Sequence, residues 1–517
     1  MNSRPAIERL AGVMVPLFSL RTRNDAGIGD IAALDPMTDL AASMGDRAIL
    51  LLPIDETSPG EASPYSALSV FAIDPIYIGL NGLAGVGPRQ VERVRRALAR
   101  VPLSDRLTIR AARRELLEAA FRHFTARGGE RAAVTDFAAR HREWLNDYAL
   151  FRALKDRFDF APWENWPDEL RRRKPEALDR AKAEFAPLID KYVYWQFLAH
   201  RQWAEVRAHA RARGVMLGGD LAFSPARDSA EVWANQQLFD LERTVGAPPD
   251  GFNPEGQKWG LPAPRWERIR ADGFALLRKR IRHARELYDF IRIDHVVGLF
   301  RTFSFGLVPG AKGGFSPAAE PEQRAQGEAV LGAILEEAGA TIVVAEDLGV
   351  IPPFVRASLS ALGVPGYKVM RWEKINDGTP AEAFVPPAEY PETSLATTST
   401  HDTDTLAEWW DAAPADERAR MLALLMPAPA ATQDAEKIAF EQVRDAMLAA
   451  LYASPSRMVM IPIQDLFGWR ERINLPGTVG RANWSWRLPL VIEDLGHDPA
   501  LSARVAQLRA MAARAGR

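Results

Sequence analysis

An aspartate and a histidine end a short apolar run near the middle of the sequence. The run is Phe290-Ile-Arg-Ile-Asp294-His295, and its length and β-branched content are typical of a strand. Side chains alternate along a strand, so Arg292 and Asp294 are expected on the same face. An arginine beside a carboxylate keeps that carboxylate ionised and oriented, as a nucleophile requires. A buried arginine–aspartate pair with a purely structural role fits the same pattern, so both interpretations stay open at this point.

Two more apolar runs downstream also end in carboxylates. Glu346 follows Val-Val-Ala, and such an apolar setting raises the pKa of a carboxyl group toward the range of a general acid. Asp402 stands beside His401 and can stabilise positive charge that develops on a sugar ring. Two carboxylates on either side of the bond are what glycoside cleavage needs, one as nucleophile and one as acid/base. The residues therefore indicate glycoside chemistry, with unrelated salt bridges as the structural alternative.

A metal site is a different interpretation of the same carboxylates. Asp294, Glu346 and Asp402, with His295 or His401, are ligand types that divalent cations accept. Asp402-Thr-Asp404 also matches the short D-x-D pattern of nucleotide-sugar transferases. No glycine-rich dinucleotide fingerprint and no P-loop accompany it, and no His/Cys spacing suggests zinc.

The elements that must position these residues are short apolar runs without alternation, which are typical of strands covered on both faces of a parallel sheet. Eight such runs occur, at residues 12–16, 47–53, 215–220, 290–294, 341–346, 366–370, 395–402 and 457–462. Helical patterns separate most of them, for example at 31–44, 203–213, 275–288, 328–338, 353–362 and 415–425. This alternation predicts an α/β fold, a (β/α)8 TIM barrel, whose catalytic residues lie at the carboxyl ends of the strands.

Two gaps between the runs are too long for simple connections. Residues 82–191 are rich in Arg, Ala, Glu and Leu at helical spacing, which predicts a helical insertion between strands 2 and 3 with solvated charged faces. Residues 225–266 are dense in Gly, Pro, Asn and aromatics, which predicts a long irregular substrate loop between strands 3 and 4. We expect one barrel over residues 1–517, with a terminal helix beyond about residue 498.

The bulk composition of the 517 residues is that of an ordinary globular protein, with 47% hydrophobic and 26% charged residues. A net charge of -2 gives no global field for nucleic acid or anionic membrane. The absence of cysteine excludes disulfides and thiolate chemistry and fits a reducing compartment. The apolar segment 10–18 is expected to be the first strand rather than a signal peptide, and no run approaches the length of a membrane span. Most of the 14 tryptophans are expected in the core, although flat aromatic faces also suit sugar rings.

Beyond these patterns, the catalytic blocks resemble those of the amylomaltase family, the 4-α-glucanotransferases or disproportionating enzymes. The similar blocks are Arg292-Ile-Asp-His295, Ala345-Glu-Asp-Leu-Gly349 and Thr400-His-Asp402. Blocks at 27–30, 63–69, 218–221, 228–235, 246–250, 256–260, 464–465, 472–474, 476–478 and 483–484 extend the likeness nearly end to end. Taken together they are very specific, whereas each block alone is a weak signal.

The resemblance implies a role for each matching residue. Asp294 would be the nucleophile, Glu346 the general acid/base and Asp402 the stabiliser of the transition state. Substrate-binding residues would be Arg292, His295, His401, Tyr65, Asp220, Asp250, Gln257, Trp259 and Asp347. Within this set Tyr65 would stack on the sugar at the cleavage point, and Trp259 would lie on the acceptor side.

The resemblance also implies a (β/α)8 barrel with inserted subdomains and no separate C-terminal β-domain. It implies transfer of α-1,4-glucan segments between maltooligosaccharides, with retention and without a metal or other cofactor. We therefore expect a cytoplasmic enzyme that is a monomer or weak homodimer and binds neither nucleic acid nor membrane. A retaining hydrolase on the same site and a non-catalytic glucan-binding barrel are the alternatives. The chain departs from the family pattern at Val296-Val-Gly298, where many members carry Phe-Arg-Gly, and at segments 251–252 and 310–315. These departures are expected to affect acceptor binding and chain-length preference.

Overall fold

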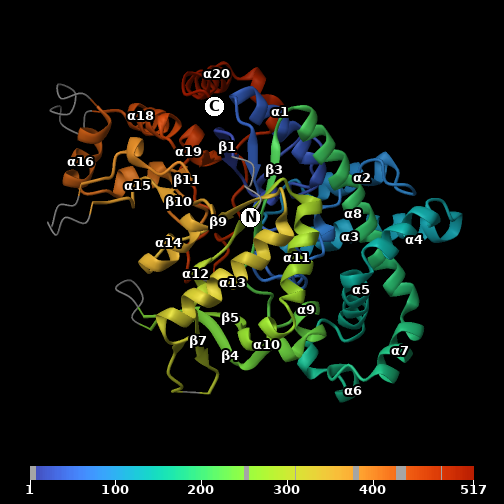
Figure 1. Cartoon of the computed structure of the whole chain (residues 1–517). Coiled ribbons are helices and arrows are strands. Elements are labelled where there is room, and N and C mark those ends of the chain that lie inside the picture. Colours follow the sequence, from blue (N-terminus) through green and yellow to red (C-terminus); the bar gives the residue numbers. More distant parts are fainter. Residues whose placement is uncertain (1–6, 250–254, 309, 376–382, 427–437, 479) are drawn as a thin grey trace.

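A closed barrel of eight parallel strands forms the centre of the molecule in the computed structural model (Figure 1). The structure describes the chain except for residues 1–6, 250–254, 309, 376–382, 427–437 and 479. The barrel strands are β1 (Leu10–Met14), β2 (Ala48–Leu50), β3 (Met216–Leu221), β6 (Phe290–Ile293), β9 (Ile342–Ala345), β10 (Gly366–Val369), β11 (Ser394–Thr397) and β12 (Met458–Pro462). Each expected apolar run supplies one of these strands, so the predicted (β/α)8 barrel is confirmed.

Strand register brings the polar ends of neighbouring strands together. β1 pairs with both β2 and β12, which closes the barrel, and Asp220 of β3 is the register partner of Arg292 of β6. Close packing of β3 against β6 requires glycine, because a Cβ at Gly218 would lie 2.1 Å from the ring of Phe290. The Gly218-Gly219 pair therefore lets the aromatic side chains that flank β6 fill the space beside β3.

Helices connect most of the barrel strands and pack around the outside. They are α1 (Leu34–Met44), α8 (Ala186–Ala212), α11 (Ala275–Leu287), α12 (Val297–Phe300), α13 (Glu320–Ala338), α14 (Pro353–Ala361), α15 (Leu406–Ala412), α16 (Ala415–Leu425), α18 (Phe440–Ala453) and α19 (Ile463–Phe467). After β12 the described chain holds α19, a short 3-10 segment and α20 (Pro499–Arg514), which packs beside α1, and no further strand. No helix in the described part of the chain combines the length and the apolar character needed to cross a membrane.

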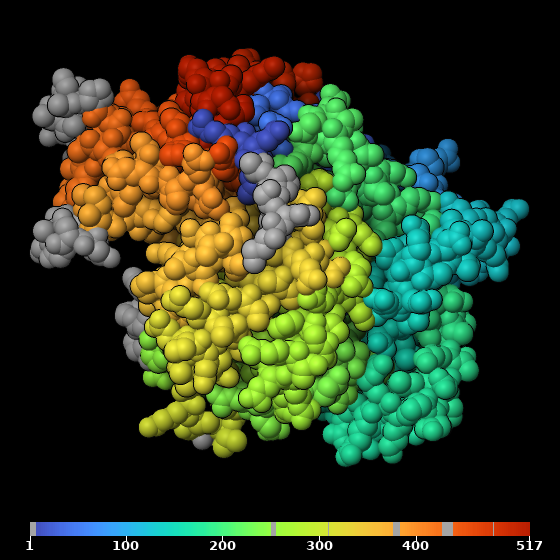
Figure 2. Space-filling model, in the orientation of Figure 1, coloured from blue at the N-terminus to red at the C-terminus, as the bar shows by residue number. Residues whose placement is uncertain are grey.

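The connection between β2 and β3 is largely helical. It contains α2 (Pro88–Leu98), α3 (Arg106–Arg127), α4 (Arg131–Arg140), α5 (Arg142–Arg157), α6 (Asp168–Arg171) and α7 (Pro175–Glu184). The later helices of this connection, α4 to α7, are cyan to teal and form one flank of the molecule in Figure 2. The expected boundary at residue 191 falls inside α8, a continuous helix that packs both on α5 of this flank and on β3 of the barrel.

A four-stranded sheet stands beside the barrel at the lower edge of Figure 1. Its strands are β4 (Phe239–Ala247), β5 (Gln257–Pro264), β7 (Thr302–Gly306) and β8 (Gly314–Ser316), in the order β5-β4-β7-β8. The segment 225–266 is therefore not an irregular loop, since it contains α9 (Ala230–Ala234), the hairpin β4–β5 and the start of α10 (Trp266–Ala271). β7 lies after β6 in the sequence and pairs with β4, so the partner that orders this segment is distant along the chain.

Most tryptophans belong to the core. Trp163, Trp203 and Trp233 are fully buried. A second, smaller apolar cluster that includes Trp163, Trp166 and Trp233 fills the space between the helical flank and α9. Trp259, in contrast, is only partly buried. The expectation that these residues are mainly core aromatics is confirmed for most of them.

Candidate active site

The carboxyl ends of four barrel strands carry polar side chains at one rim. Asp220 is the penultimate residue of β3, Asp294 follows β6 and Glu346 follows β9. His401 and Asp402 follow β11 after a short turn. Because all barrel strands run in parallel, their carboxyl ends meet at one rim, which is where barrel enzymes carry their sites.

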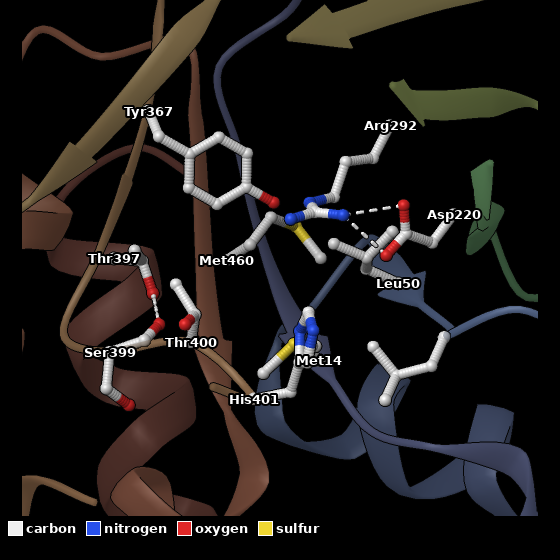
Figure 3. Close-up of a pocket in the computed structure, with 11 residues that line it drawn as sticks. Met14, Leu50, Asp220, Arg292, Tyr367, Thr397, Ser399, Thr400, His401 and Met460 are labelled. Carbon is white, nitrogen blue, oxygen red and sulfur yellow. Dashed lines mark hydrogen bonds and ion pairs between the residues drawn. The ribbon is translucent and has the colours of Figure 1, made fainter. Parts of the chain in front are cut away.

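Arg292 is the buried cation at the centre of this group. One of its terminal nitrogens donates to both carboxylate oxygens of Asp220, at 2.7 and 2.6 Å, and to Asp294 at 3.0 Å. Burial opposes the charge, but Asp220 and the other surrounding groups outweigh it and raise the pKa of Arg292. Figure 3 shows the guanidinium between Tyr367 and Asp220. All three residues line a small cavity of about 10 Å³. Arg292 is therefore a fixed positive charge that orients Asp294, whose side chain remains 25% exposed.

Glu346 is held by backbone donors instead of by a cation. The amide of His295 donates to one carboxylate oxygen at 2.8 Å, and the amide of Leu348 donates to the other at 3.0 Å. His295 has φ of 48°, a left-handed conformation that is uncommon for a residue with a side chain and is concentrated at functional sites. Burial raises the pKa of Glu346 to about 7, with Arg292 opposing and Asp294 supporting the shift. A substantial fraction of Glu346 is therefore protonated near neutral pH.

Asp402 has the opposite electrostatic setting. His401 lies 3.2 Å from one carboxylate oxygen, and the side-chain amide of Asn474 donates to the other at 2.6 Å. Burial alone would raise the pKa of Asp402, but His401, Asn474 and Arg292 together outweigh it and lower the pKa to about 2. Asp402 is therefore a permanent anion at the rim, and its side chain is 45% exposed.

Tyr65 connects Asp220 with His401. Its hydroxyl donates to Asp220 at 2.6 Å and lies 3.0 Å from Nε2 of His401. The rings of Tyr65 and His401 are stacked, with centroids 5.4 Å apart and an angle of 18° between their planes. This chain of contacts connects the Arg292 group with Asp402 through two aromatic rings.

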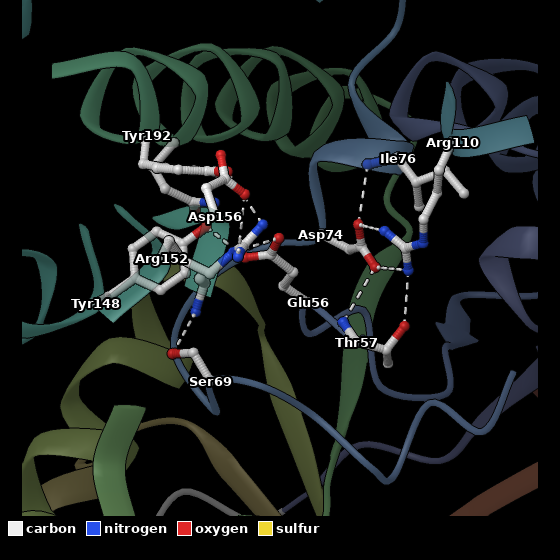
Figure 4. A network of polar contacts seen from close by, with 12 residues as sticks. Glu56, Thr57, Ser69, Asp74, Ile76, Arg110, Tyr148, Arg152, Asp156 and Tyr192 are labelled. Atoms are coloured by element: carbon white, nitrogen blue, oxygen red, sulfur yellow. Dashed lines mark hydrogen bonds and ion pairs between the residues drawn. The ribbon is translucent and has the colours of Figure 1, made fainter. Parts of the chain in front are cut away.

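A buried ionic network holds the segment that carries Tyr65. Glu56, in the same segment, accepts from Arg152 at 2.9 Å and from the hydroxyl of Tyr148 at 2.6 Å (Figure 4). The backbone amide of Leu68 donates to the carbonyl of Glu56 at 2.6 Å, which holds together the two ends of segment 56–68 that contains Tyr65. Arg152 and Tyr148 belong to α5, so the helical flank fixes a residue of the candidate site through this network.

The β4–β5 hairpin brings two of the expected residues to His295. The ring of Trp259 meets the ring of His295 edge-on, with centroids 4.8 Å apart, and the indole nitrogen donates to Gln257 at 3.1 Å. Burial lowers the pKa of His295 to about 4, so this imidazole is neutral at pH 7. The expected site residue Asp250 lies outside the described residues.

Asp347 does not join the group at the rim. It is 3% exposed and accepts from the amide of Tyr367 at 2.6 Å and from Arg356 at 3.2 Å. Asp347 therefore contacts β10 and α14, whereas the neighbouring Glu346 accepts from the amide of His295, which follows β6. Val296 and Val297, where the chain departs from the family pattern, are both buried at the start of α12.

The carboxylates that suggested a metal site have other partners. Asp404 pairs with Arg472 at 2.5 Å, whereas Asp402 accepts from Asn474 and lies next to His401. The two aspartates of the D-x-D pattern are thus directed to different donors. Glu346 likewise has an amide donor on each oxygen. This donor set fits hydrogen-bonded carboxylates better than ligands of one cation.

Three further residues at the site were not assigned a role from the sequence. Asn474 donates a hydrogen bond to Asp402. The guanidinium carbon of Arg292 lies 5.6 Å from the ring centroid of Tyr367. Trp484 packs on both Tyr65 and His401. Asn474 and Trp484 occur in blocks that carry the family resemblance, so that likeness was the available signal for them. No sequence pattern pointed to Tyr367.

The fold and the site define a class of enzyme. A closed parallel barrel presents an aspartate held by arginine, a glutamate with a raised pKa and a permanently charged aspartate at one rim. This combination is that of barrel enzymes that cleave and form glycosidic bonds.

Comparison with known proteins agrees and is more specific. The family model described as 4-alpha-glucanotransferase matches residues 15–492, so the chain belongs to the 4-alpha-glucanotransferase family. A relative of that name from Chlamydia caviae is 32% identical over 508 residues, covering 96% of this chain and 94% of the relative. One from Thermus thermophilus is 35% identical over 459 residues, covering 86% and 88%. The amylomaltase of Streptococcus agalactiae, solved with acarbose, superposes with a TM-score of 0.84 at 26% identity over 99% of this chain and 100% of that one.

Proposed function

We propose that this chain transfers α-1,4-glucan segments between maltooligosaccharides by double displacement, with Asp294, Glu346 and Asp402 as its catalytic residues. In the first step Asp294 attacks the anomeric carbon while Glu346 gives its proton to the departing glycosidic oxygen. The carbon–oxygen bond breaks, and the glucan becomes an ester of Asp294. In the second step Glu346 takes the proton of an incoming 4-hydroxyl group, that oxygen attacks the same carbon, and Asp294 is released with the original anomeric configuration.

The contrast between the three carboxyl environments carries this proposal. Glu346 has a pKa of about 7 and can hold a proton, whereas Asp402 has a pKa of about 2 and cannot. Asp294 is directed by Arg292 and stays accessible to a substrate. Enzymes that run acid and nucleophile chemistry at one pH separate their carboxyl groups in this way.

Contacts around the carboxylates support a sugar ligand. Tyr65 presents a partly buried ring, and His401 together with Asp220 presents hydrogen-bonding groups beside it. Trp259, held by Gln257, presents a second partly buried aromatic face next to His295. Aromatic faces bind the C–H faces of sugars while polar groups bind the hydroxyls. We assign the Tyr65 side to the sugar at the cleavage point and the Trp259 side to the acceptor. Acarbose in the Streptococcus agalactiae amylomaltase supports an oligosaccharide ligand.

Maltotriose separates glucan transfer from hydrolysis, the second candidate. The same carboxylates serve a retaining hydrolase, because only the acceptor differs in the second step. Resolving the products of maltotriose should show glucose and a ladder of longer oligosaccharides. Glucose and maltose without longer products would contradict transfer and support the hydrolase.

Replacing the nucleophile tests the catalytic assignment itself. Asp294→Asn should abolish turnover of maltotriose while binding of maltooligosaccharides, measured by calorimetry, is largely retained. Asp404→Asn is the matched control, because Asp404 pairs with Arg472 and is not one of the three carboxylates. Undiminished turnover in Asp294→Asn would show that the nucleophile is another group. The expected monomer or weak dimer is tested by light scattering, and the predicted cytoplasmic location by cell fractionation.

A further inference from the structure

Three histidines and a glutamate gather on the outside of the barrel, apart from the three carboxylates. We call His141, His200, His283 and Glu286 the histidine cluster. His141 lies between α4 and α5, His200 is on α8, and His283 and Glu286 are on α11. The ring centroid of His200 lies 5.4 Å from that of His141 and 5.5 Å from that of His283. Ligand atoms of His141, His283 and Glu286 all lie within 4.8 Å of one another.

Hydrogen bonds to backbone carbonyls define which ring nitrogens carry lone pairs. Nε2 of His283 lies 2.8 Å from the carbonyl of Phe71, and Nδ1 of His200 lies 2.8 Å from the carbonyl of Gln196. A carbonyl only accepts, so these two nitrogens carry hydrogens and the opposite nitrogens carry lone pairs. Nε2 of His200 is buried and has no hydrogen-bond partner in the described chain. Metal-binding histidines characteristically donate their other nitrogen to a carbonyl or carboxylate in this way.

Packing alone accounts for only part of the cluster. Trp144 and Phe137 contact its rings, for example with centroids of Trp144 and His283 5.1 Å apart, so the histidines also belong to an aromatic layer. In the described chain neither ring donates a hydrogen bond to Nε2 of His200, and the indole N–H of Trp144 is itself buried without a partner. Glu286 is 52% exposed, and among the described residues its only ion-pair contact is with Nδ1 of His141, at 3.7 Å. Nearby arginines raise the positive potential at Glu286 without forming an ion pair with it.

We propose that His141, His283 and Glu286 bind a divalent transition metal ion such as Zn²⁺. His200 lies beside these ligands but outside the group whose ligand atoms are within 4.8 Å of one another, so it would become a fourth ligand only if its ring moved closer. Two or three imidazoles with one carboxylate are a ligand set that zinc accepts in tetrahedral geometry. His283 and Glu286 are three residues apart on α11, so they share one face of that helix. Tetrahedral ligand atoms at zinc–nitrogen distances of about 2.0–2.1 Å lie roughly 3.4 Å apart, so the side chains would move inward by an ångström or so.

The place of the cluster indicates a structural ion. It would join the α4–α5 junction of the helical flank to α11, next to α8, and α11 leads directly into β6. β6 carries Arg292 and precedes Asp294, so the ion would stabilise the support of the active site without touching substrate. The residues of the cluster come from the α4–α5 junction, α8 and α11, which are far apart in the sequence, and this is why no local spacing suggested zinc.

Metal binding can be measured on the full-length protein after dialysis against a chelator. We expect one Zn²⁺ per chain by elemental analysis after removal of excess metal, a visible Co²⁺ spectrum of a four-coordinate site, and a higher thermal midpoint with Zn²⁺. Glu286→Gln keeps shape and removes the carboxylate, and it should weaken Zn²⁺ binding at least ~10-fold. His209→Gln is the matched control, because His209 is a partly exposed histidine of α8 that lies beside Asp39.

Each outcome decides the proposal. Equal loss of Zn²⁺ affinity in Glu286→Gln and His209→Gln, or no stoichiometric Zn²⁺ in the wild type, would overturn it. A second variant, His283→Gln, should lose the Co²⁺ spectrum. If that variant does not fold, the half-exposed Glu286 still provides the test, since its side chain makes few contacts in the folded chain. Transfer from maltotriose at low temperature should be equal with and without Zn²⁺.

Discussion

Raising the pH through the pKa of Glu346 should switch off glucan transfer. The acid form of Glu346 donates the proton in the first step, and burial places its pKa at about 7 instead of the ordinary 4.5. Above that pKa each pH unit leaves ~10-fold less of the active form, so kcat/KM should fall to ~1% about two units higher. A glutamate of ordinary pKa would retain only ~0.3% of its acid form at pH 7, and the decline would start in the acid range. The two cases differ by about 100-fold in the rate at neutral pH.

The assay is the initial rate of glucose release from maltotriose, measured as kcat/KM across the pH range. In Glu346→Gln the side chain cannot exchange a proton, so kcat should fall by about 10²–10⁴-fold and the decline near pH 7 should disappear. Glu328→Gln is the control, because Glu328 is an exposed residue of α13 that accepts from Ser358 and lies outside the rim group. If the decline near pH 7 persists in Glu346→Gln, another group is the acid and the assignment is wrong.

Three further variants test the surroundings of the site and one buried acid. Tyr65→Phe removes the hydroxyl that donates to Asp220, and kcat/KM for maltotriose should fall about 10-fold. Asn474→Ala removes the donor that orients Asp402, so kcat should fall by roughly 10- to 100-fold with little change in the thermal midpoint, and an unchanged kcat would refute that role. Asp46 is buried, neither of its side-chain oxygens has a hydrogen-bond partner among the described residues, and burial raises its pKa to about 7. The unfolded carboxyl ionises above its ordinary 3.8, so the folded state loses stability as the pH rises from there to about 7. Asp46→Asn should therefore stabilise the fold by about 2–4 kcal/mol at pH 8 and by little at pH 4, as measured by chemical denaturation.

The barrel was predictable because each strand has a signal in its own local sequence. A parallel strand buried on both faces needs a continuous apolar run, and runs such as Phe290–Ile293 and Ile342–Ala345 have that character. The small sheet was not predictable from residues 225–266. β4 and β5 contain glycine and proline, and their order depends on pairing with β7, a partner that follows β6 in the sequence. Propensity within the segment carries no signal for that distant partner.

Sequence likeness alone does not give the contacts of particular residues. Asp347 stands next to Glu346 and was expected to bind substrate, and it accepts from the amide of Tyr367 and from Arg356. Asn474 received no role from the sequence, although it makes the shortest hydrogen bond to Asp402. Whether a polar residue faces the rim depends on the side of the chain it occupies and on what packs there.

The sequence by itself determined where the carboxylates stand, because parallel strands of similar length put Asp294, Glu346 and Asp402 at one rim. Only the tertiary structure decided what each carboxylate can do. The pKa of Glu346 depends on burial and on the charges of Arg292 and Asp294, and that of Asp402 depends on burial, His401 and Asn474. Both the burial of a carboxyl group and the charges near it depend on residues from other strands, which the fold brings close together. The histidine cluster follows the same rule, since His141, His200 and His283 come together only when the helical flank packs on the barrel.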